Sequence, residues 1–197
     1  MKERHHFFTS CRGQSLIEFA LVLPLALLIV LGVIEVGTVL LDEHVVTRLS
    51  REGSNLISRD TSLQTAAAVL ASMSARPVDF SNGSKVIFSV IKRGATTGTA
   101  NYDKLVLYQR AEFGTFSGPA PSRVQSPGGA FSGPPDYIAT NSDTDAGLRV
   151  TGVPANLVTV KGGMVYVTEI FTTRLRITPL DRFGVAVPET LYSIAYF

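Results

Sequence analysis

A long apolar segment near the start of the chain constrains the fold most strongly. Residues 19–34 read FALVLPLALLIVLGVI, and the apolar run over 16–41 contains only two carboxylates. About 20 apolar residues are enough for a helix to cross the hydrocarbon core of a bilayer. The run exceeds the apolar region of a secretory signal, about 7 to 15 residues, and no A-x-A-like cleavage site follows it. The sequence therefore predicts a transmembrane helix over 14–41 that stays attached as an anchor.

The charges that flank this segment predict its orientation. The whole formal charge of +2 comes from residues 1–13, which contain Lys2, Arg4 and Arg12 against Glu3. The acidic pair Asp42 and Glu43 follows the apolar run. Because basic residues favour the cytoplasmic side, we expect 1–13 to be a cytoplasmic leader and everything after about Leu41 to lie outside the cytoplasm. Residues 14–197 are formally neutral, so no basic surface is expected for nucleic acid.

Few residues are suited to metal binding or catalysis. The only cysteine is Cys11, and the three histidines are His5, His6 and His44. One cysteine allows neither a disulfide framework nor a thiolate metal site, and His5 and His6 are expected to be solvated. The only histidine outside the leader follows the apolar run directly, and no paired acids or nucleophile elbow appear. We expect no catalytic residues, no metal site, no cofactor and no enzymatic activity.

Glu18, Pro24 and Glu35 are the unusual residues within the apolar run. A charged side chain costs roughly 2.5 to 3.5 kcal/mol at the centre of a transmembrane helix. Glu18 either lies at headgroup depth, near the positive end of the helix dipole, or requires a partner in the membrane. Pro24 leaves the carbonyl of Ala20 without its usual donor, which predicts a kink between these residues. Glu35 is interpreted as a residue of the outer interface.

The residues around Glu18 form a recognisable motif. The segment Gly13-Gln14-Ser15-Leu16-Ile17-Glu18-Phe19 follows a short basic leader and resembles the prepilin-peptidase site of type IV pilins and pseudopilins. Residues 12–37, including Pro24, are similar to the opening of the TadE/TadF-like minor pilins of the Tad (Flp) pilus machinery. The resemblance implies cleavage between Gly13 and Gln14, with Glu18 as the fifth residue of the mature chain.

The resemblance also implies partners and a location. Glu18 would pair with the new α-amine of a neighbouring subunit. The expected partners are a prepilin peptidase, other pilins and minor pilins, the inner-membrane pilus assembly platform and the lipid bilayer. The chain would span the bacterial inner membrane once, with a periplasmic or extracellular C-terminal domain. The TadE and TadF types are not separated, and the subunit could enter the fibre, cap its tip or stay in the membrane.

Helical spacing continues beyond the membrane segment. Apolar residues recur among charged ones up to Arg59, which predicts an amphipathic stalk that Gly53, Ser54 and Asn55 weaken. Thr61 and Gln64 fit a capping box for a second, short helix before Pro77. The stalk and this helix are expected to occupy 42–77.

Strand patterns follow in residues 78–197, which we expect to form an extracytoplasmic β-rich domain. Alternating or β-rich runs predict strands at 86–91, 105–108, 164–177 and the final TLYSIAYF, and the first two suggest a hairpin. Residues 114–135 are rich in Gly, Pro and Ser, so they are expected to form a loop. Glu169 falls on the apolar face of its strand and needs a partner or a sheet edge.

These elements predict an α+β fold, with a long N-terminal helix, a short helix and an antiparallel, pilin-like sheet of about four strands. A minor pilin or pseudopilin explains the leader, the Gly13 and Glu18 motif, the anchor and the sheet together. The alternative is a generic single-pass anchored binding domain unrelated to pili. That alternative leaves Gly13 and Glu18 as coincidence.

Overall fold

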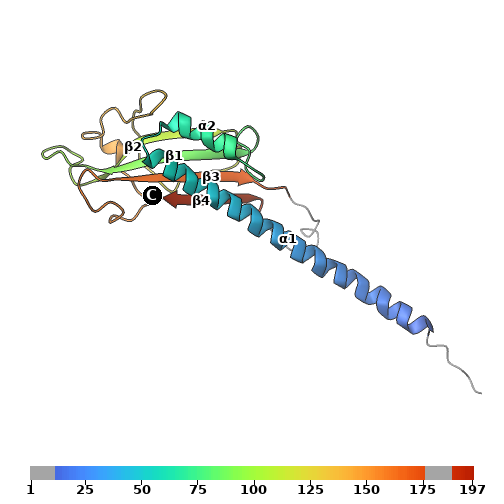
Figure 1. The fold of residues 1–197 in the computed structure, drawn as a ribbon. Helices are drawn as coiled ribbons and strands as arrows, with labels where there is room; N and C mark the ends of the chain where they lie inside the picture. The colour runs from blue at the N-terminus through green and yellow to red at the C-terminus, as the bar shows by residue number, and fades with distance from the viewer. Residues whose placement is uncertain (1–11, 176–187) are drawn as a thin grey trace, which may run out of the picture. The chain divides into compact units, whose positions relative to one another are not determined.

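The computed structural model describes residues 12–175 and 188–197 and has an α+β fold. Two helices, α1 (Arg12–Ser58) and α2 (Leu63–Met73), precede the strands β1 (Ser84–Arg93) and β2 (Leu105–Gly114). A 3-10 turn, η1 (Ala146–Leu148), comes before β3 (Met164–Thr173) and β4 (Thr190–Tyr196) (Figure 1). This arrangement confirms the predicted fold class. The described residues divide into two compact units, residues 12–39 and residues 40–175 with 188–197.

The described part of the first unit is the N-terminal portion of α1. The helix continues without interruption through Pro24. A kink at Pro24 stays a prediction. The apolar side chains of this portion are largely exposed, from Leu16 and Ile17 through Ile29 to Val33 and Val36. A helix that is apolar on all sides requires an apolar environment such as lipid or other helices.

The second unit is built on a four-stranded antiparallel sheet with the order β2-β1-β3-β4. β1 and β2 form the expected hairpin, with a register shift between Val90 and Ile91. Both strands of this hairpin are longer than predicted, and β3 ends at Thr173. Arg176 and Ile177, at the end of the predicted third strand, lie outside the described residues.

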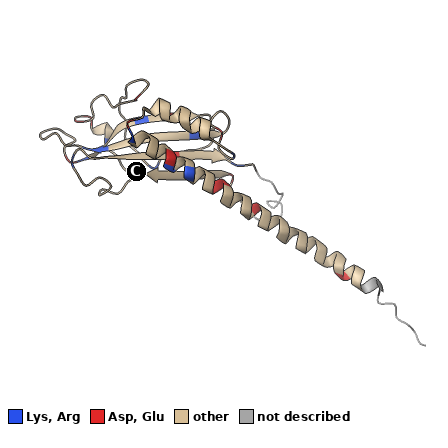
Figure 2. Ribbon diagram, viewed as in Figure 1, with Lys and Arg blue, Asp and Glu red and all other residues tan. Residues whose placement is uncertain are grey.

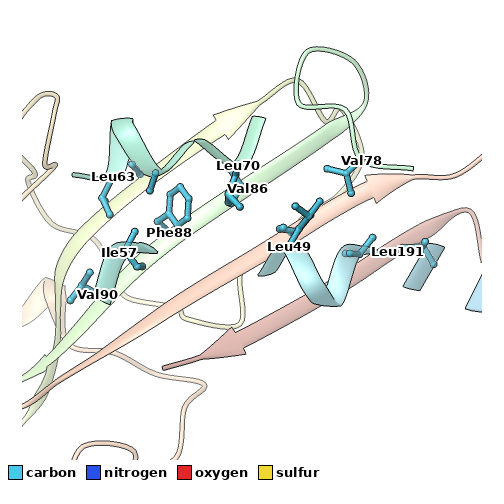
Figure 3. Close-up of a cluster of buried hydrophobic side chains, with 13 residues drawn as sticks. Leu49, Ile57, Leu63, Leu70, Val78, Val86, Phe88, Val90 and Leu191 are labelled. Atoms are coloured by element: carbon cyan, nitrogen blue, oxygen red, sulfur yellow. The ribbon is translucent and has the colours of Figure 1, made fainter. Parts of the chain in front are cut away.

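One face of the sheet packs against both helices. In Figure 3, Leu49 and Ile57 of α1 and Leu63 and Leu70 of α2 surround sheet residues that include Val86, Phe88, Val90 and Leu191. These side chains are at most 5 % exposed. Burying an aliphatic or aromatic side chain contributes about 1.5 to 3 kcal/mol. This shared core holds the C-terminal part of α1 on the sheet.

Gly53 and Ser54, two of the residues that the sequence suggested would weaken α1, lie with Ser50 where the helix packs closely against the sheet. Ser50 Oγ is 2.9 Å from Ser193 Oγ, and Ser54 Oγ donates to the carbonyl of Ala195 at 3.0 Å. A Cβ atom on Gly53 would lie 2.7 Å from Cγ2 of Thr168. The lack of larger side chains therefore permits close packing, and α1 remains helical to Ser58.

We expect Gly53→Leu to lower the free energy of unfolding of the outer domain by about 3 kcal/mol, because the added side chain has no space against Thr168. The same substitution at Gly37, where a Cβ would meet nothing within 4 Å, serves as the matched control. Thermal unfolding of both full-length variants, followed by tyrosine fluorescence, measures the difference. Equal unfolding temperatures would contradict the packing argument.

The second helix begins one residue later than the capping-box prediction implies. Ser62 is its N-cap, and its side chain accepts a hydrogen bond from the backbone N–H of Thr65 at 3.3 Å. The predicted pairing of Thr61 with Gln64 was therefore wrong by one position. The error is small because Thr61 and Ser62 are both good N-cap residues, so sequence alone does not separate them. The helix ends at Met73, before Pro77.

The other face of the sheet is covered by the segment between β2 and β3. Its buried apolar residues, including Val124, Ala139 and Leu148, pack against Ile91 and Val167 of the sheet. Between 115 and 135 the described backbone forms only isolated bridges, at Gln125 and Phe131. This confirms the predicted loop, which is held as a packed layer by contacts with the sheet.

Candidate functional site

The sequence-predicted site residues all lie within the first half of α1. Gly13 and Gln14 belong to the first turn of the helix, while Glu18 and Pro24 follow within the same uninterrupted helix. Gln14 and Glu18 are separated by about 6 Å along the axis, at 1.5 Å per residue. Glu18 is exposed, and Gly13 and Gln14 are described here only as backbone. The structure thus places the motif at the beginning of the exposed apolar helix.

The apolar part of α1 is suited to a membrane. Within the described residues, one helix is long and apolar enough to cross a bilayer. None of its most apolar window is buried inside the molecule. Glu35 differs from the apolar residues around it, because it is only 2 % exposed. These observations support single-pass anchoring through α1.

An ion pair ties α1 to the sheet shortly after the apolar run. Arg174 Nε lies 3.3 Å from Asp42 Oδ2, and the Arg174 side chain is fully buried. The Arg174 backbone N–H donates to the carbonyl of Glu189 at 2.9 Å, next to the start of β4. The sequence placed Asp42 in the acidic flank of the membrane segment and residue 174 within the predicted strand over 164–177, and it did not pair Asp42 with Arg174. No local pattern links residues that are 132 positions apart.

Glu169 lies at the centre of a second polar cluster. It is fully buried on β3, an inner strand of the sheet, so the partner that its sequence position required must come from nearby segments. Its Oε1 accepts hydrogen bonds from the backbone N–H of Arg123 and from the Tyr192 hydroxyl, each at 2.7 Å. Its Oε2 accepts a hydrogen bond from the Ser122 hydroxyl. The expectation of a partner is confirmed.

This cluster joins three parts of the outer domain. Ser122 and Arg123 belong to the Gly/Pro-rich loop, Glu169 to β3 and Tyr192 to β4. Burial, together with the hydrogen bond to the Glu169 carboxylate, raises the pKa of Tyr192 above its ordinary value. The hydroxyl therefore remains a proton donor at neutral pH. The cluster attaches the loop to the sheet, because the Glu169 carboxylate accepts hydrogen bonds from both the loop and β4.

Two further observations concern possible metal or ligand sites among the described residues. No three His, Cys, Asp or Glu side chains in the described ranges lie close enough together to hold a metal ion. A hollow of about 400 Å³ lies beside the Gly/Pro-rich loop, lined by residues that include Arg110, Gln125 and Phe131. The Arg110 guanidinium already donates to the carbonyl of Val124 at 2.7 Å.

Comparison with known proteins agrees with this location. The family model described as TadE-like protein matches residues 13–55, which contain Gly13, Gln14, Glu18 and Pro24. No curated protein and no solved structure matches the chain. The matched segment covers most of α1 and leaves the sheet outside it. The similarity to TadE-like proteins therefore covers residues 13–55, the segment that contains the motif.

Proposed function

We propose that this chain is a minor pilin or pseudopilin subunit that serves the assembly of a Tad (Flp) type pilus. The observation that carries the proposal is the Gly13, Gln14 and Glu18 motif at the start of an exposed apolar helix, inside the TadE-like segment. The role is structural: the subunit primes or caps a pilus and catalyses no reaction. The buried core and the polar cluster around Glu169 give the outer domain a defined surface for this role.

Processing by a prepilin peptidase is the first step of the proposed function. Cleavage of the Gly13–Gln14 peptide bond removes residues 1–13 and creates an α-amino cation on Gln14. Glycine lacks a Cβ, so its backbone can adopt conformations in a protease cleft that other residues avoid. The bond lies in the first turn of α1, where glycine weakens a helix by about 1 kcal/mol relative to alanine. Local unwinding at this end therefore costs little free energy.

Glu18 is the proposed assembly contact. In a single anchored chain its carboxylate has an unfavourable position among apolar residues such as Leu16 and Phe19. The α-amine of Gln14 on a neighbouring processed subunit supplies the opposite charge. The contact forms between subunits, so Glu18 promotes assembly with other pilins and minor pilins.

The proposed location is the bacterial inner membrane. The basic leader faces the cytoplasm, α1 crosses the bilayer once, and the domain after about Leu41 lies in the periplasm or outside the cell. This orientation presents Gly13 to the peptidase and the N-terminal helix to the assembly platform within the lipid bilayer.

The test is the mass of the native protein in cells with and without the prepilin peptidase. We expect the chain to begin at Gln14 only when the peptidase is present. Gly13→Leu should leave the leader attached, because the bulky side chain does not fit where glycine is required. Gly32→Leu, within the apolar run, is the matched control and should be processed normally. An intact mass that does not depend on the peptidase would instead favour a single-pass anchored binding domain unrelated to pili.

A further inference from the structure

The two outer edges of the sheet differ in how they are covered. At one edge, β2 forms backbone hydrogen bonds with the segment that follows the Gly/Pro-rich loop. The Arg110 N–H donates to the carbonyl of Tyr137 at 3.2 Å, and the Ala139 N–H donates to the carbonyl of Tyr108 at 2.8 Å. β4 lies at the opposite edge and, among the described strands, pairs with β3 alone (Figure 1). The fold therefore covers the β2 edge with its own backbone and adds no described strand beyond β4.

The register of β4 shows which of its backbone groups face away from the sheet. Phe197 and Tyr166 exchange two hydrogen bonds, at 2.9 and 3.0 Å, and bonded pairs in an antiparallel ladder recur at every second residue. Tyr192, Ile194 and Tyr196 therefore direct their N–H and C=O groups away from β3. These backbone groups form no hydrogen bond within the described ranges. We define these three residues as the open edge.

The sequence of β4 does not protect the open edge. Thr190–Tyr196 contains no charged residue and no proline, and its pairing with β3 has no bulge. Figure 2 accordingly shows no Lys, Arg, Asp or Glu on β4. Natural sheets use charges, prolines and bulges to block strand addition at an exposed edge. An edge without them is suited to β-augmentation, in which an extended segment of a partner adds as a further strand.

One face of the sheet beside the open edge is largely apolar. The centroids of the Tyr192 and Phe171 rings are 4.7 Å apart, and the Tyr192 hydroxyl donates to Glu169 on the face that the Gly/Pro-rich loop covers. Ile194 packs against the buried cluster on the same face. Side chains of an added strand that lie directly opposite Tyr192, Ile194 and Tyr196 project to this face as well. Apolar residues therefore suit those positions.

The intervening side chains of an added strand would project to the other face, toward α1. The helix contacts β4 there through two serines, since Ser50 Oγ is 2.9 Å from Ser193 Oγ and Ser54 Oγ donates to the carbonyl of Ala195. Polar residues therefore suit the intervening positions.

A basic hollow lies at the C-terminal end of β4. Its volume is about 530 Å³, and Arg51 and Arg59 of α1 line it together with Tyr196 and Phe197. Neither guanidinium forms an ion pair or hydrogen bond with another described residue. Glu52 also lines the hollow, so its three charged side chains leave an excess of positive charge. This charge favours an acidic residue at the adjacent end of an added strand.

We propose that the open edge binds an extended segment of another protein, which adds antiparallel to β4 as a fifth strand of the sheet. The segment alternates apolar residues, opposite the three residues of the open edge, with polar residues that face α1. An acidic residue precedes it and lies in the basic hollow, because the N-terminal end of an antiparallel segment lies beside the C-terminal end of β4. Main-chain hydrogen bonds supply the affinity, and the alternating side chains and the acidic residue supply the specificity. The contact goes beyond the pilin role and does not depend on processing at Gly13.

The test uses a synthetic peptide, acetyl-Glu-Val-Thr-Val-Thr-Val-amide, and the full-length chain in detergent micelles. Backbone amide exchange, followed by NMR, reports directly on the open edge. We expect the amides of Tyr192, Ile194 and Tyr196 to exchange rapidly in the free chain and about ten-fold more slowly or less with saturating peptide. A second peptide with Lys in place of Glu should bind about ten-fold more weakly.

Two sets of variants locate the contact on the chain. Ile194→Pro removes an outward N–H but no hydrogen bond to β3, so the sheet should fold and peptide binding should fall about ten-fold. Ile194→Ala, which keeps the N–H and also loses the side chain, is the matched control and should retain most of the binding. Arg51→Glu with Arg59→Glu changes two exposed side chains and should reverse the preference, so that the Lys peptide binds more tightly.

Each alternative result overturns the proposal. Edge amides that exchange equally fast with and without peptide would exclude strand addition, and equal binding by Ile194→Pro and Ile194→Ala would place the peptide elsewhere. If Ile194→Pro does not fold, the Arg51→Glu, Arg59→Glu variant decides, because an unchanged preference for the Glu peptide contradicts the basic hollow. Exchange that slows without peptide as the protein concentration rises would identify a second copy as the occupant. All of these measurements use the unprocessed chain, so their outcome is independent of the pilin role.

Discussion

Glu169→Ala should lower the free energy of unfolding of the outer domain by about 3 to 5 kcal/mol. The substitution removes the acceptor for three donors, the Ser122 hydroxyl, the Arg123 backbone N–H and the Tyr192 hydroxyl. Glu169 is fully buried, so these donors lose their partner in a place that water reaches poorly. The Gly/Pro-rich loop should also detach from the sheet and become sensitive to protease.

Glu169→Gln is the matched control for this prediction, because it keeps the size of the side chain and one acceptor oxygen. We expect its cost to be about 1 to 2 kcal/mol, since one hydrogen bond to a charged group is lost. Denaturant unfolding followed by tyrosine fluorescence measures both variants, as the chain has no tryptophan. If Glu169→Ala unfolds at the same denaturant concentration as the unsubstituted chain, the cluster does not hold the loop.

The elements that sequence predicted well are those with a local signal. The apolar run and its helical continuation gave α1 to within one residue of its end, and alternation or β-rich composition located all four strands. The Gly, Pro and Ser content of residues 114–135 predicted the loop. Each of these signals depends on neighbours within a few positions, because backbone periodicity decides which side chains share a face.

The features that sequence missed depend on contacts between distant segments. Glu169 was recognised as anomalous from its strand position, but Ser122 lies 47 residues away in a loop without periodicity. Gly53 was interpreted as a weak point of the helix, yet its role is the close approach to Thr168. Intrinsic propensity could not show this, because tertiary packing overrides the cost of a glycine in a helix.

For the candidate site, the sequence indicated the residues and the structure described their surroundings. Gly13, Gln14, Glu18 and Pro24 were identified by a short motif, and the family match covers all four. The structure adds that the helix they begin is apolar and exposed. The partners of these residues on other chains are implied by the family resemblance and not by the structure of a single chain.

Glu18→Gln should therefore give cells with few or no pili, although insertion and processing remain normal. The neutral amide is easier to bury than the carboxylate, so membrane insertion should not suffer. The peptidase is expected to read mainly Gly13 and the apolar run, so cleavage should also survive. What is lost is the attraction to the α-amine of a neighbouring Gln14. Breaking a buried charge pair costs about 3 kcal/mol or more, which corresponds to over about 100-fold in the contact equilibrium.

The competing interpretation, in which Glu18 lies at headgroup depth, predicts a different result. In that case Glu18→Gln removes only a helix-dipole interaction, worth about 0.3 to 1 kcal/mol, and the number of pili stays unchanged. Glu18→Asp keeps the charge on a side chain one methylene shorter and should retain part of the piliation. Pili counted by electron microscopy, with chain level and N-terminal mass measured in the same cells, decide between the two. Unchanged pilus number in Glu18→Gln cells would show that Glu18 is not an assembly contact, whereas a graded loss from Glu to Asp to Gln identifies its charge as the part that assembly requires.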